Sequence, residues 1–206
     1  MNAGKIGSGL VALVFGFLVQ GSPTSWAGEK SAIFAGGCFW CVEKDFEHVN
    51  GVLAAESGYT GGTLENPTYR NHTGHVEAVR ITFDDTVVSY PELLYIFWRS
   101  VDPTDDGGQF CDRGHSYTTA IFTLDDVQMQ QATASKKAVD DSGKLPAPIA
   151  TPIVAASTFT VAEEYHQDYY KKNPVRYSYY RRGCGRDARV QQLWGSEAHA
   201  GIQHDS

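Results

Sequence analysis

The sequence predicts a single α+β domain, and two features lead to that fold class. Short apolar segments suited to strands are mixed along the chain with segments whose apolar residues recur every three or four positions. A chain of 206 residues, 42% hydrophobic and 20% charged, is long enough to bury one good core. The formal net charge of −7 argues against nucleic acid and anionic lipid as partners.

Residues 1–27 differ from the rest of the chain and predict a secretory signal peptide. The positive charge of Lys5 precedes the apolar run LVALVFGFLV, and the polar stretch QGSPTSWA follows it. The run is too short for a membrane-spanning helix, which needs about 20 apolar residues. We therefore expect cleavage after Ala27, export of the protein, with the periplasm as its compartment, and a mature domain over residues 28–206.

The mature domain begins with a predicted strand that leads into a predicted helix. Residues 32–35 form a short apolar run, and Gly36 and Gly37 end it. The strand-to-helix junction therefore carries Cys38 and Cys41, in the stretch GGCFWCVE. The apolar residues that recur at helical spacing after the glycines are Phe39, Val42, Phe46 and Val49.

The middle of the chain predicts a strand, a helix and a loop. Residues 79–83 alternate in the way typical of a strand, and Pro91 is suited to the first turn of a helix. That helix ends before Asp102 and Pro103, and residues 102–116 form a glycine-containing loop. The apolar residues of the helix are Leu93, Leu94, Phe97, Trp98 and Val101.

The last third of the chain predicts two more strands and two more helices. A turn with the sequence GKLPAP separates the first pair of elements from the second, and the tail from Val175 onward is rich in Arg, Tyr and Gly. In order, the predicted elements are a strand around residues 117–124, a helix over 125–139, a strand over 149–156 and a helix over 161–172, stopped by Asn173 and Pro174.

The cysteines indicate thiol chemistry. A sulfur at a helix N-terminus faces unpaired backbone N–H groups, so the position of Cys38 predicts a thiolate and makes it the candidate nucleophile. Spacing argues against zinc, because Cys111 and Cys184 are single and far from each other, and against haem attachment, because Val42 stands where a His is required. The loop over residues 102–113 does not fit an EF-hand either. We predict no metal.

One carboxylic acid has the strand parity of core residues. In HVEAVRITF, Glu77 shares its side of the predicted strand with Val79, Ile81 and Phe83. A carboxyl group on an apolar face is pushed toward its protonated form. Pattern alone leaves open a second interpretation, in which Glu77 lies at a frayed strand start and is solvated.

Seven motifs in this order resemble one family over nearly the whole mature chain. They are GCFW, SGYTGG, NPTYR, TGHVEAV, DPTD, GGQF and EEYHQDYYKKNP, and the family is the peptide methionine sulfoxide reductases of the A type. The resemblance implies a mixed α+β sandwich with a ferredoxin-like core. It also implies a thiol enzyme without metal or organic cofactor, acting on the S epimer of methionine sulfoxide in proteins or as the free amino acid.

The resemblance also implies roles for individual residues. Cys38 would attack the sulfoxide sulfur and become a sulfenic acid, with Glu77 protonating the leaving oxygen. The remaining roles are a methyl pocket of Phe39 and Trp40, hydrogen bonds to the sulfoxide oxygen from Tyr69 and Tyr117, and a site lining that includes Asp112 and His166. A thioredoxin-type dithiol protein would reduce the resulting disulfide, and we expect the enzyme to be a monomer.

The chain departs from the family pattern at three positions, and two of them bear on the thiol that resolves the sulfenic acid. Cys41 stands where Gly is common, Cys111 lies in the active-site loop, and Thr118 stands where Arg is usual. We favour Cys184 as the resolving thiol, because Gly183 and Gly185 flank it and nearby arginines favour its thiolate. Cys41 comes second and Cys111 third. The alternative is a structural Cys111–Cys184 disulfide, with Cys38 and Cys41 cycling together.

Two other classes of function remain open from sequence. A dithiol oxidoreductase of thioredoxin type is the first, because a CxxC at a helix start and the pair Thr151–Pro152 before an apolar strand imitate such a protein. A secreted binding module held by two disulfides is the second, and it requires all four cysteines to be paired.

Overall fold

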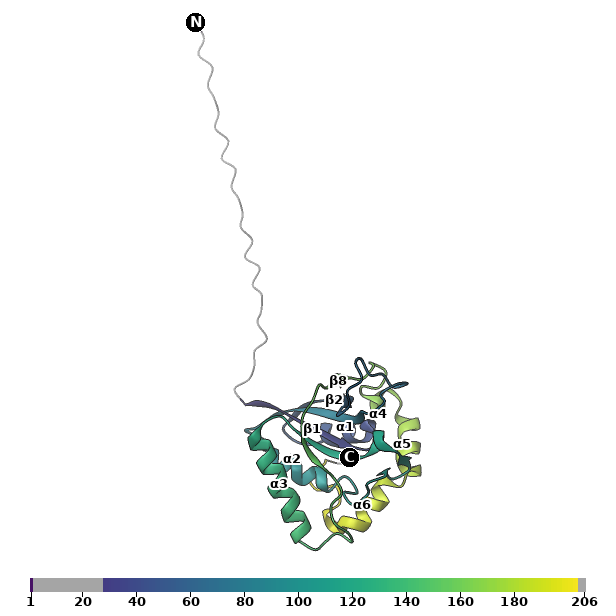
Figure 1. Cartoon of the computed structure of the whole chain (residues 1–206). Helices are drawn as coiled ribbons and strands as arrows, with labels where there is room; N and C mark the ends of the chain where they lie inside the picture. Colours follow the sequence, from purple (N-terminus) through teal and green to yellow (C-terminus); the bar gives the residue numbers. More distant parts are fainter. Residues whose placement is uncertain (2–27, 204–206) are drawn as a thin grey trace.

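The computed structural model describes residue 1 and residues 28–203 (Figure 1), so residues 2–27 of the predicted signal peptide lie outside the described part. A six-stranded sheet runs through the domain, and a two-stranded hairpin lies beside it. In chain order the elements are β1 (Glu29–Gly36), α1 (Phe39–Glu47), β2 (Val52–Thr60), β3 (Val76–Asp84), α2 (Tyr90–Trp98), β4 (Gly108–Gln109), β5 (Asp112–Arg113), η1 (His115–Tyr117), β6 (Thr119–Thr123), α3 (Asp126–Asp141), β7 (Ile153–Ala155), β8 (Thr160–Val161), α4 (Tyr169–Lys172), α5 (Pro174–Gly183), α6 (Arg186–Trp194) and η2 (Gly195–Glu197).

The centre of the sheet has ferredoxin-like topology, as the resemblance implied. The sheet order is β7-β6-β1-β3-β2-β8, and the pairs β1/β3, β1/β6 and β2/β3 are antiparallel. Elements β1, α1, β2, β3, α2 and β6 thus follow the βαββαβ order of that fold. Strand β7 extends the sheet in parallel beside β6, and β8 extends it beside β2.

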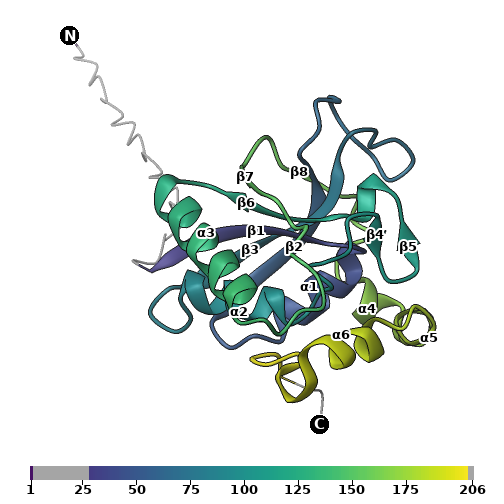
Figure 2. The ribbon, with the colours of Figure 1, turned by 60° about the horizontal axis from the view of Figure 1, so that its bottom comes forward.

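Helices α1 and α2 cover one face of the sheet (Figure 2). Strand residues Val79, Ile81 and Phe83 point into this layer and are fully buried. Helix α2 begins with a capping box, in which Ser89 accepts from the backbone N–H of Glu92 and the Glu92 carboxylate accepts from that of Ser89. Because side chains alternate between the two faces along β3, every second residue of this strand points into this core.

The other face of the sheet is buried too, by a smaller cluster. Its members come from the opposite parity of the strands, and Phe159 packs against them. A sheet that is covered on both sides explains why the strand segments are almost continuously apolar. The buried members are Ile33, Ala35, Val76, Ala78, Ala120 and Phe122.

One predicted helix is wrong, and the sequence analysis did not foresee strands β2, β4, β5 and β8 or helices α5 and α6. Residues 161–172 form the end of β8, a turn and the four-residue helix α4 in place of one long helix. The Gln167 side chain explains the turn, since it exchanges hydrogen bonds with the backbone of Ser57 in β2 at 2.9 Å. Asp168 then adopts a positive φ of 53°. Tertiary contacts with β2, which the sequence analysis missed, override the local pattern.

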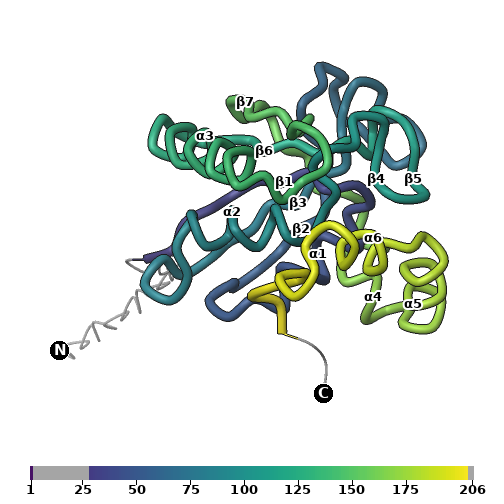
Figure 3. Tube along the Cα trace, turned by 90° about the horizontal axis from the view of Figure 1, so that it is seen from below, coloured from purple at the N-terminus to yellow at the C-terminus, as the bar shows by residue number. Residues whose placement is uncertain are grey.

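The C-terminal part folds into three helices that pack together on one side of α1 (Figure 3). Within α5, Tyr177 is the buried residue, and the Arg181 guanidinium contacts the buried carboxylate of Asp45 in α1 at 2.6 Å. Helix α6 inserts Arg186, whose side chain donates to the carbonyl oxygens of Ser100 and Gly36. In the described residues, no helix combines the length and the apolar character needed to cross a membrane.

Candidate active site

Cys38 lies at the start of α1, directly after β1, as predicted. Gly37 has φ of +85°, and a Cβ there would lie 2.6 Å from Cβ of Gln109, so the turn requires glycine. The Cys38 carbonyl oxygen accepts from the backbone N–H of Cys41 at 3.1 Å, which closes the first helical turn. The turn holds the Cys38 side chain in a site where the residue is only 6% exposed.

Glu77 lies beside this turn and is 1% exposed, which agrees with its predicted parity in β3. Its Oε2 accepts a hydrogen bond from the backbone N–H of Phe39 at 3.0 Å. Burial raises the pKa of Glu77 to about 8, and the hydrogen bond from Phe39 only partly opposes this rise. A largely protonated carboxylic acid therefore stands next to the candidate nucleophile near neutral pH.

A cavity of about 60 Å³ joins these two residues to most of the other predicted site residues. A cavity of about 10–15 Å³ holds one water molecule. The larger cavity beside Cys38 therefore has room for a chemical group of a few heavy atoms. Its side chains come from α1, β3, β5, η1, α5 and the loop between β2 and β3. The cavity is lined by Cys38, Phe39, Trp40, Tyr69, Glu77, Asp112, Tyr117 and Tyr180.

His166 is not in that lining, although the sequence analysis placed it there. It lies behind Trp40, whose indole Nε1–H donates to His166 Nδ1 at 3.0 Å. Burial lowers the pKa of His166, so the imidazole is neutral and carries its proton on Nε2, a buried atom without a partner. Tyr169 stacks on Trp40 with ring centroids 3.7 Å apart. His166 and Tyr169 thus set the orientation of the Trp40 wall.

Three tyrosines of the lining can donate hydrogen bonds to a bound oxygen. Burial raises the pKa of Tyr69, Tyr117 and Tyr180, so all three phenols keep their protons. Tyr69 is 38% exposed and lies at the mouth of the site. The sequence analysis missed Tyr180, whose hydroxyl donates to Asp112 Oδ2 and lies within hydrogen-bond reach of Cys38. Its position one helical turn before Cys184 was the available signal.

The ionisation of Cys38 differs from the sequence prediction. Burial raises its pKa well above the ordinary value, and the hydrogen bond with Cys41 and the charge of Cys41 act in the same direction. The helix N-terminus does not offset this, because Glu77 occupies the Phe39 N–H. The hydrogen bond that Cys38 donates to Cys41 lowers the pKa of Cys41 to about 6, and the positive charges of Arg186 and Arg181 add to this effect. The two thiols therefore titrate as a pair, and the interaction between them favours the loss of one proton from the pair.

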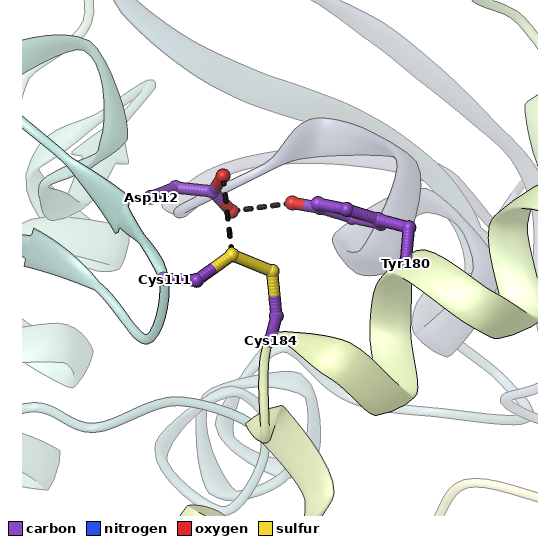
Figure 4. Close-up of a disulfide and its surroundings, with 4 residues drawn as sticks. All are labelled: Cys111, Asp112, Tyr180 and Cys184. Atoms are coloured by element: carbon purple, nitrogen blue, oxygen red, sulfur yellow. Dashed lines mark hydrogen bonds between the residues drawn. A yellow bond between two sulfur atoms is a disulfide. The ribbon is translucent and has the colours of Figure 1, made fainter.

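Cys111 and Cys184 form a disulfide across 73 residues of sequence (Figure 4), while Cys38 and Cys41 are free. The sequence analysis favoured Cys184 as the resolving thiol, and the structure has the Cys111–Cys184 pairing that it held as its alternative. The hairpin β4–β5 and the end of α5 bring the two Cα atoms within 4.8 Å. The identity of the resolving thiol stays a prediction.

Two groups of described residues gather atoms of the kind that bind metals. One consists of Cys111, Asp112 and Cys184, whose sulfurs are bonded to each other. The other consists of Glu43, Glu47 and Asp168, and hydrogen bonds from Ser57 and Tyr170 already engage Glu43 and Glu47. Of the first group Asp112 lines the cavity, and no member of the second group does.

A buried thiol with a second thiol in hydrogen-bond reach and a protonated acid beside it defines a cysteine-dependent oxidoreductase site. Residues 30–198 match the family model described as peptide methionine sulfoxide reductase. Peptide methionine sulfoxide reductase MsrA 2 of Rhizobium meliloti is 51% identical over 95% of this chain and 100% of its own length. The MsrA of Bacillus licheniformis is 56% identical over 80% of this chain and 93% of its own.

Solved structures agree. Mxr1 from Saccharomyces cerevisiae, in reduced form, matches with a TM-score of 0.66 and 28% identity over 72% of this chain and 87% of its own. The chain belongs to the peptide methionine sulfoxide reductase family. It is an oxidoreductase that reduces methionine sulfoxide, and its α+β fold with a mostly antiparallel sheet is that of the A-type enzymes.

Proposed function

We propose that Cys38 attacks the sulfur of the S epimer of methionine sulfoxide while Glu77 protonates the oxygen. The observation that carries this assignment is that both side chains line one small cavity, with the acid held at the first turn of the helix that Cys38 begins. The sulfoxide sulfur gains two electrons and leaves as methionine, and the oxygen passes to Cys38 as a sulfenic acid. The Cys38 thiol proton goes to Cys41, which already accepts a hydrogen bond from it.

The cavity walls support the choice of substrate. Phe39 and Trp40 offer an apolar surface to the substrate methyl group, and Tyr69 and Tyr117 offer hydroxyl protons to the oxygen. Only the head group of the substrate fits a space of about 60 Å³, so the rest of a peptide or of free methionine sulfoxide lies outside it. Recognition of the head group alone explains how proteins and the free amino acid can share one site.

Cys41 is the resolving thiol in this proposal. Its sulfur attacks the sulfur of the Cys38 sulfenic acid, a disulfide forms, and the oxygen leaves as water with the proton of Cys41. Hydrogen bonding between the two side chains supports this order, because neither backbone segment has to move far. Cys184, which the sequence analysis favoured, would first have to lose its bond to Cys111.

An external dithiol protein of thioredoxin type then reduces the Cys38–Cys41 disulfide by thiol exchange. Yeast Mxr1 has been solved in complex with Trx2, and that chain shares this fold at 22% identity and a TM-score of 0.50. Such a donor must be supplied in the compartment where the enzyme works.

We further propose that the enzyme is exported to the periplasm as a monomer whose mature chain begins at Gly28. The support is the arrangement of Lys5, the apolar run and the polar stretch before Ala27. Mass spectrometry of cell-derived protein should find residues 1–27 removed, and light scattering should give the mass of one chain. Retained residues 1–27 in the cell-derived protein would contradict export.

The decisive assay compares three substrates at equal enzyme and dithiol: a peptide with S sulfoxide, the same peptide with R sulfoxide, and insulin. We expect methionine from the S peptide alone, and none from the Cys38→Ser variant even in excess dithiol, because no other described thiol lines the cavity. Reduction of insulin without reduction of sulfoxide would support the thioredoxin-type alternative. Turnover by Cys38→Ser would remove Cys38 from the mechanism.

A further inference from the structure

The Cys111–Cys184 disulfide joins two segments that each supply a side chain to the cavity (Figure 4). Cys111 lies in the turn of the β4–β5 hairpin, directly before Asp112. Cys184 lies just after α5, and its backbone N–H donates to the carbonyl oxygen of Tyr180 at 2.9 Å. The covalent link therefore lies one residue from one cavity side chain and one helical turn from the other.

The two cavity side chains also contact each other. The Tyr180 hydroxyl donates to Asp112 Oδ2, while Sγ of Cys111 lies 3.7 Å from the other carboxylate oxygen. The hydroxyl has a single proton, which it gives either to Asp112 or to the sulfur of Cys38, and donation to Cys38 lowers the pKa of that thiol. A continuous series of contacts therefore runs from the disulfide through Asp112 and Tyr180 to the reacting sulfur.

The hairpin has little structure of its own to hold Asp112 in place. Each of its strands has two residues, and its turn contains Phe110 with a positive φ of 57° and the exposed Cys111. Two-stranded hairpins are marginally stable at best in water. Gln109, the partner of Asp112 across the hairpin, is anchored through hydrogen bonds to Asp102, and Arg113 forms an ion pair with Asp105, but neither contact engages the Asp112 side chain.

Helix α5 is equally dependent on ties to its surroundings. Tyr177 is its buried residue, and most of its side chains, including Tyr179 at 84% exposed, face solvent. Ion pairs of Arg181 with Asp45 and Asp187 hold the inner side of the helix. At its end, Gly183 and Gly185 leave the backbone free to move, and Cys184 stands between them.

We propose that the Cys111–Cys184 disulfide positions two side chains for catalysis: it holds Asp112 and Tyr180 where the Tyr180 hydroxyl can contact the sulfur of Cys38. Tyr180 is the catalytic residue of the group, since it contacts the reacting sulfur, and the two cysteines act through it. The proposal rests on the proposed role of Cys38. It assigns to Cys111 and Cys184 a task in the first chemical step, before any resolving thiol is needed.

That timing makes the proposal separable from a role of Cys184 as a resolving thiol. With reductant absent and enzyme in excess over the S-sulfoxide peptide, methionine forms once, and its rate reports only the attack by Cys38 and the departure of methionine. We expect this rate to fall by about 10-fold to 100-fold in Cys111→Ser/Cys184→Ser, the range that a misplacement of about 1 Å produces. Cys111→Ser alone, which changes one exposed side chain, should fall equally.

Tyr180→Phe supplies the internal comparison, because it keeps the disulfide and removes the hydroxyl. It should slow methionine formation to a similar degree, and combining it with the two serines should add little, as expected for residues acting as one unit. Tyr179→Phe, the neighbouring exposed phenol on the same helix, is the matched control and should match wild type.

A second readout detects loss of the contact with Cys38 directly. The pH profile of Cys38 alkylation by iodoacetamide should move to higher pH in both Tyr180→Phe and Cys111→Ser/Cys184→Ser, because each loses the hydrogen bond that lowers the pKa of Cys38. A disulfide that only stabilised the fold would leave this profile unchanged in the folded variant.

The possible outcomes distinguish failure of this proposal from failure of the proposed function. Unchanged methionine formation in the serine variants with loss of dithiol-driven turnover would overturn the proposal and return Cys184 to a role in thiol exchange. Fully additive effects of Tyr180→Phe and the serine pair would also overturn it, because the cysteines would then not act through Tyr180. Absence of methionine formation in wild type would instead contradict the proposed function itself.

Discussion

The carboxylate of Glu77 accepts a hydrogen bond from the backbone N–H of Phe39, 3.0 Å away, at the turn that presents Cys38. The helix N-terminus therefore orients the acid rather than the nucleophile. The raised pKa of Glu77, from burial, leaves the group able to give up a proton near neutral pH. Glu77 is thus positioned to donate a proton, whereas the Cys38 thiol must lose its proton during attack.

Replacing Glu77 with glutamine should slow the chemistry while keeping binding. The amide can still donate a hydrogen bond to the sulfoxide oxygen, but it cannot transfer a proton, so single-turnover methionine formation should drop by roughly 10²–10⁴-fold. Rapid-quench measurement at saturating sulfoxide tests this. Glu56→Gln on the neighbouring strand, opposite Arg80, is the matched control. A wild-type rate in Glu77→Gln would remove the acid from the mechanism.

The rate of that step should fall at alkaline pH. Glu77 is active when protonated and Cys41 accepts the Cys38 proton as a thiolate, so single-turnover rates should be level between about pH 6 and 8, the pKa values of Cys41 and Glu77, and decline above pH 8. In Glu77→Gln the decline should be absent, since the amide does not titrate. A wild-type rate that climbs from pH 8 to 9 would mean that thiolate formation, and not proton donation, limits the step.

Burial of Glu77 should also make stability depend on pH. Its pKa is about 4.5 unfolded and about 8 folded, so the folded state binds the extra proton between those values. The stabilising contribution is complete below pH 4.5 and is lost as pH rises to 8, by about 3–5 kcal/mol. Urea unfolding across this range should show wild type losing more stability than Glu77→Gln. If the two proteins lost equal stability over this pH range, Glu77 would be solvent-exposed in the folded protein.

One turnover without reductant should leave a bond between Cys38 and Cys41. Hydrogen bonding between the two side chains favours this pairing over one that must first break the Cys111–Cys184 bond. Peptide mapping after reaction with one equivalent of sulfoxide decides between them. Protein purified without reductant should show two free thiols before the reaction and none after it. A Cys38–Cys184 linkage would restore the order favoured from sequence.

His166→Leu should raise KM for the sulfoxide by about 10-fold and destabilise the fold, because it leaves the half-buried Trp40 N–H without its acceptor, at a cost of about 1–3 kcal/mol. Steady-state kinetics and urea unfolding measure the two effects. His166→Asn is the conservative variant, since its amide oxygen can take the place of Nδ1, and it should recover most of KM. Equal KM in all three proteins would show that Trp40 needs no such support.

Local pattern was sufficient for much of the fold. Periodicity placed the β1–α1 junction, the core of β3 and the start of α2, because each of these elements buries one regular side of itself. It failed at residues 161–172, where the side chains of Glu163 and Gln167 bond to β2 and its neighbouring loop. No short-range signal carries such contacts, which cross about a hundred residues of chain.

By itself, the sequence determined the family, because motifs record residue types at fixed spacings. It also predicted the nucleophile and the acid, and strand parity placed Glu77 on an apolar face. The tertiary structure decided how the thiols pair, which phenol meets Cys38 and where His166 acts. It also reversed the predicted ionisation of Cys38. These properties depend on burial and on neighbours distant in the chain, and in a low dielectric the nearest charges and hydrogen bonds outweigh any local preference.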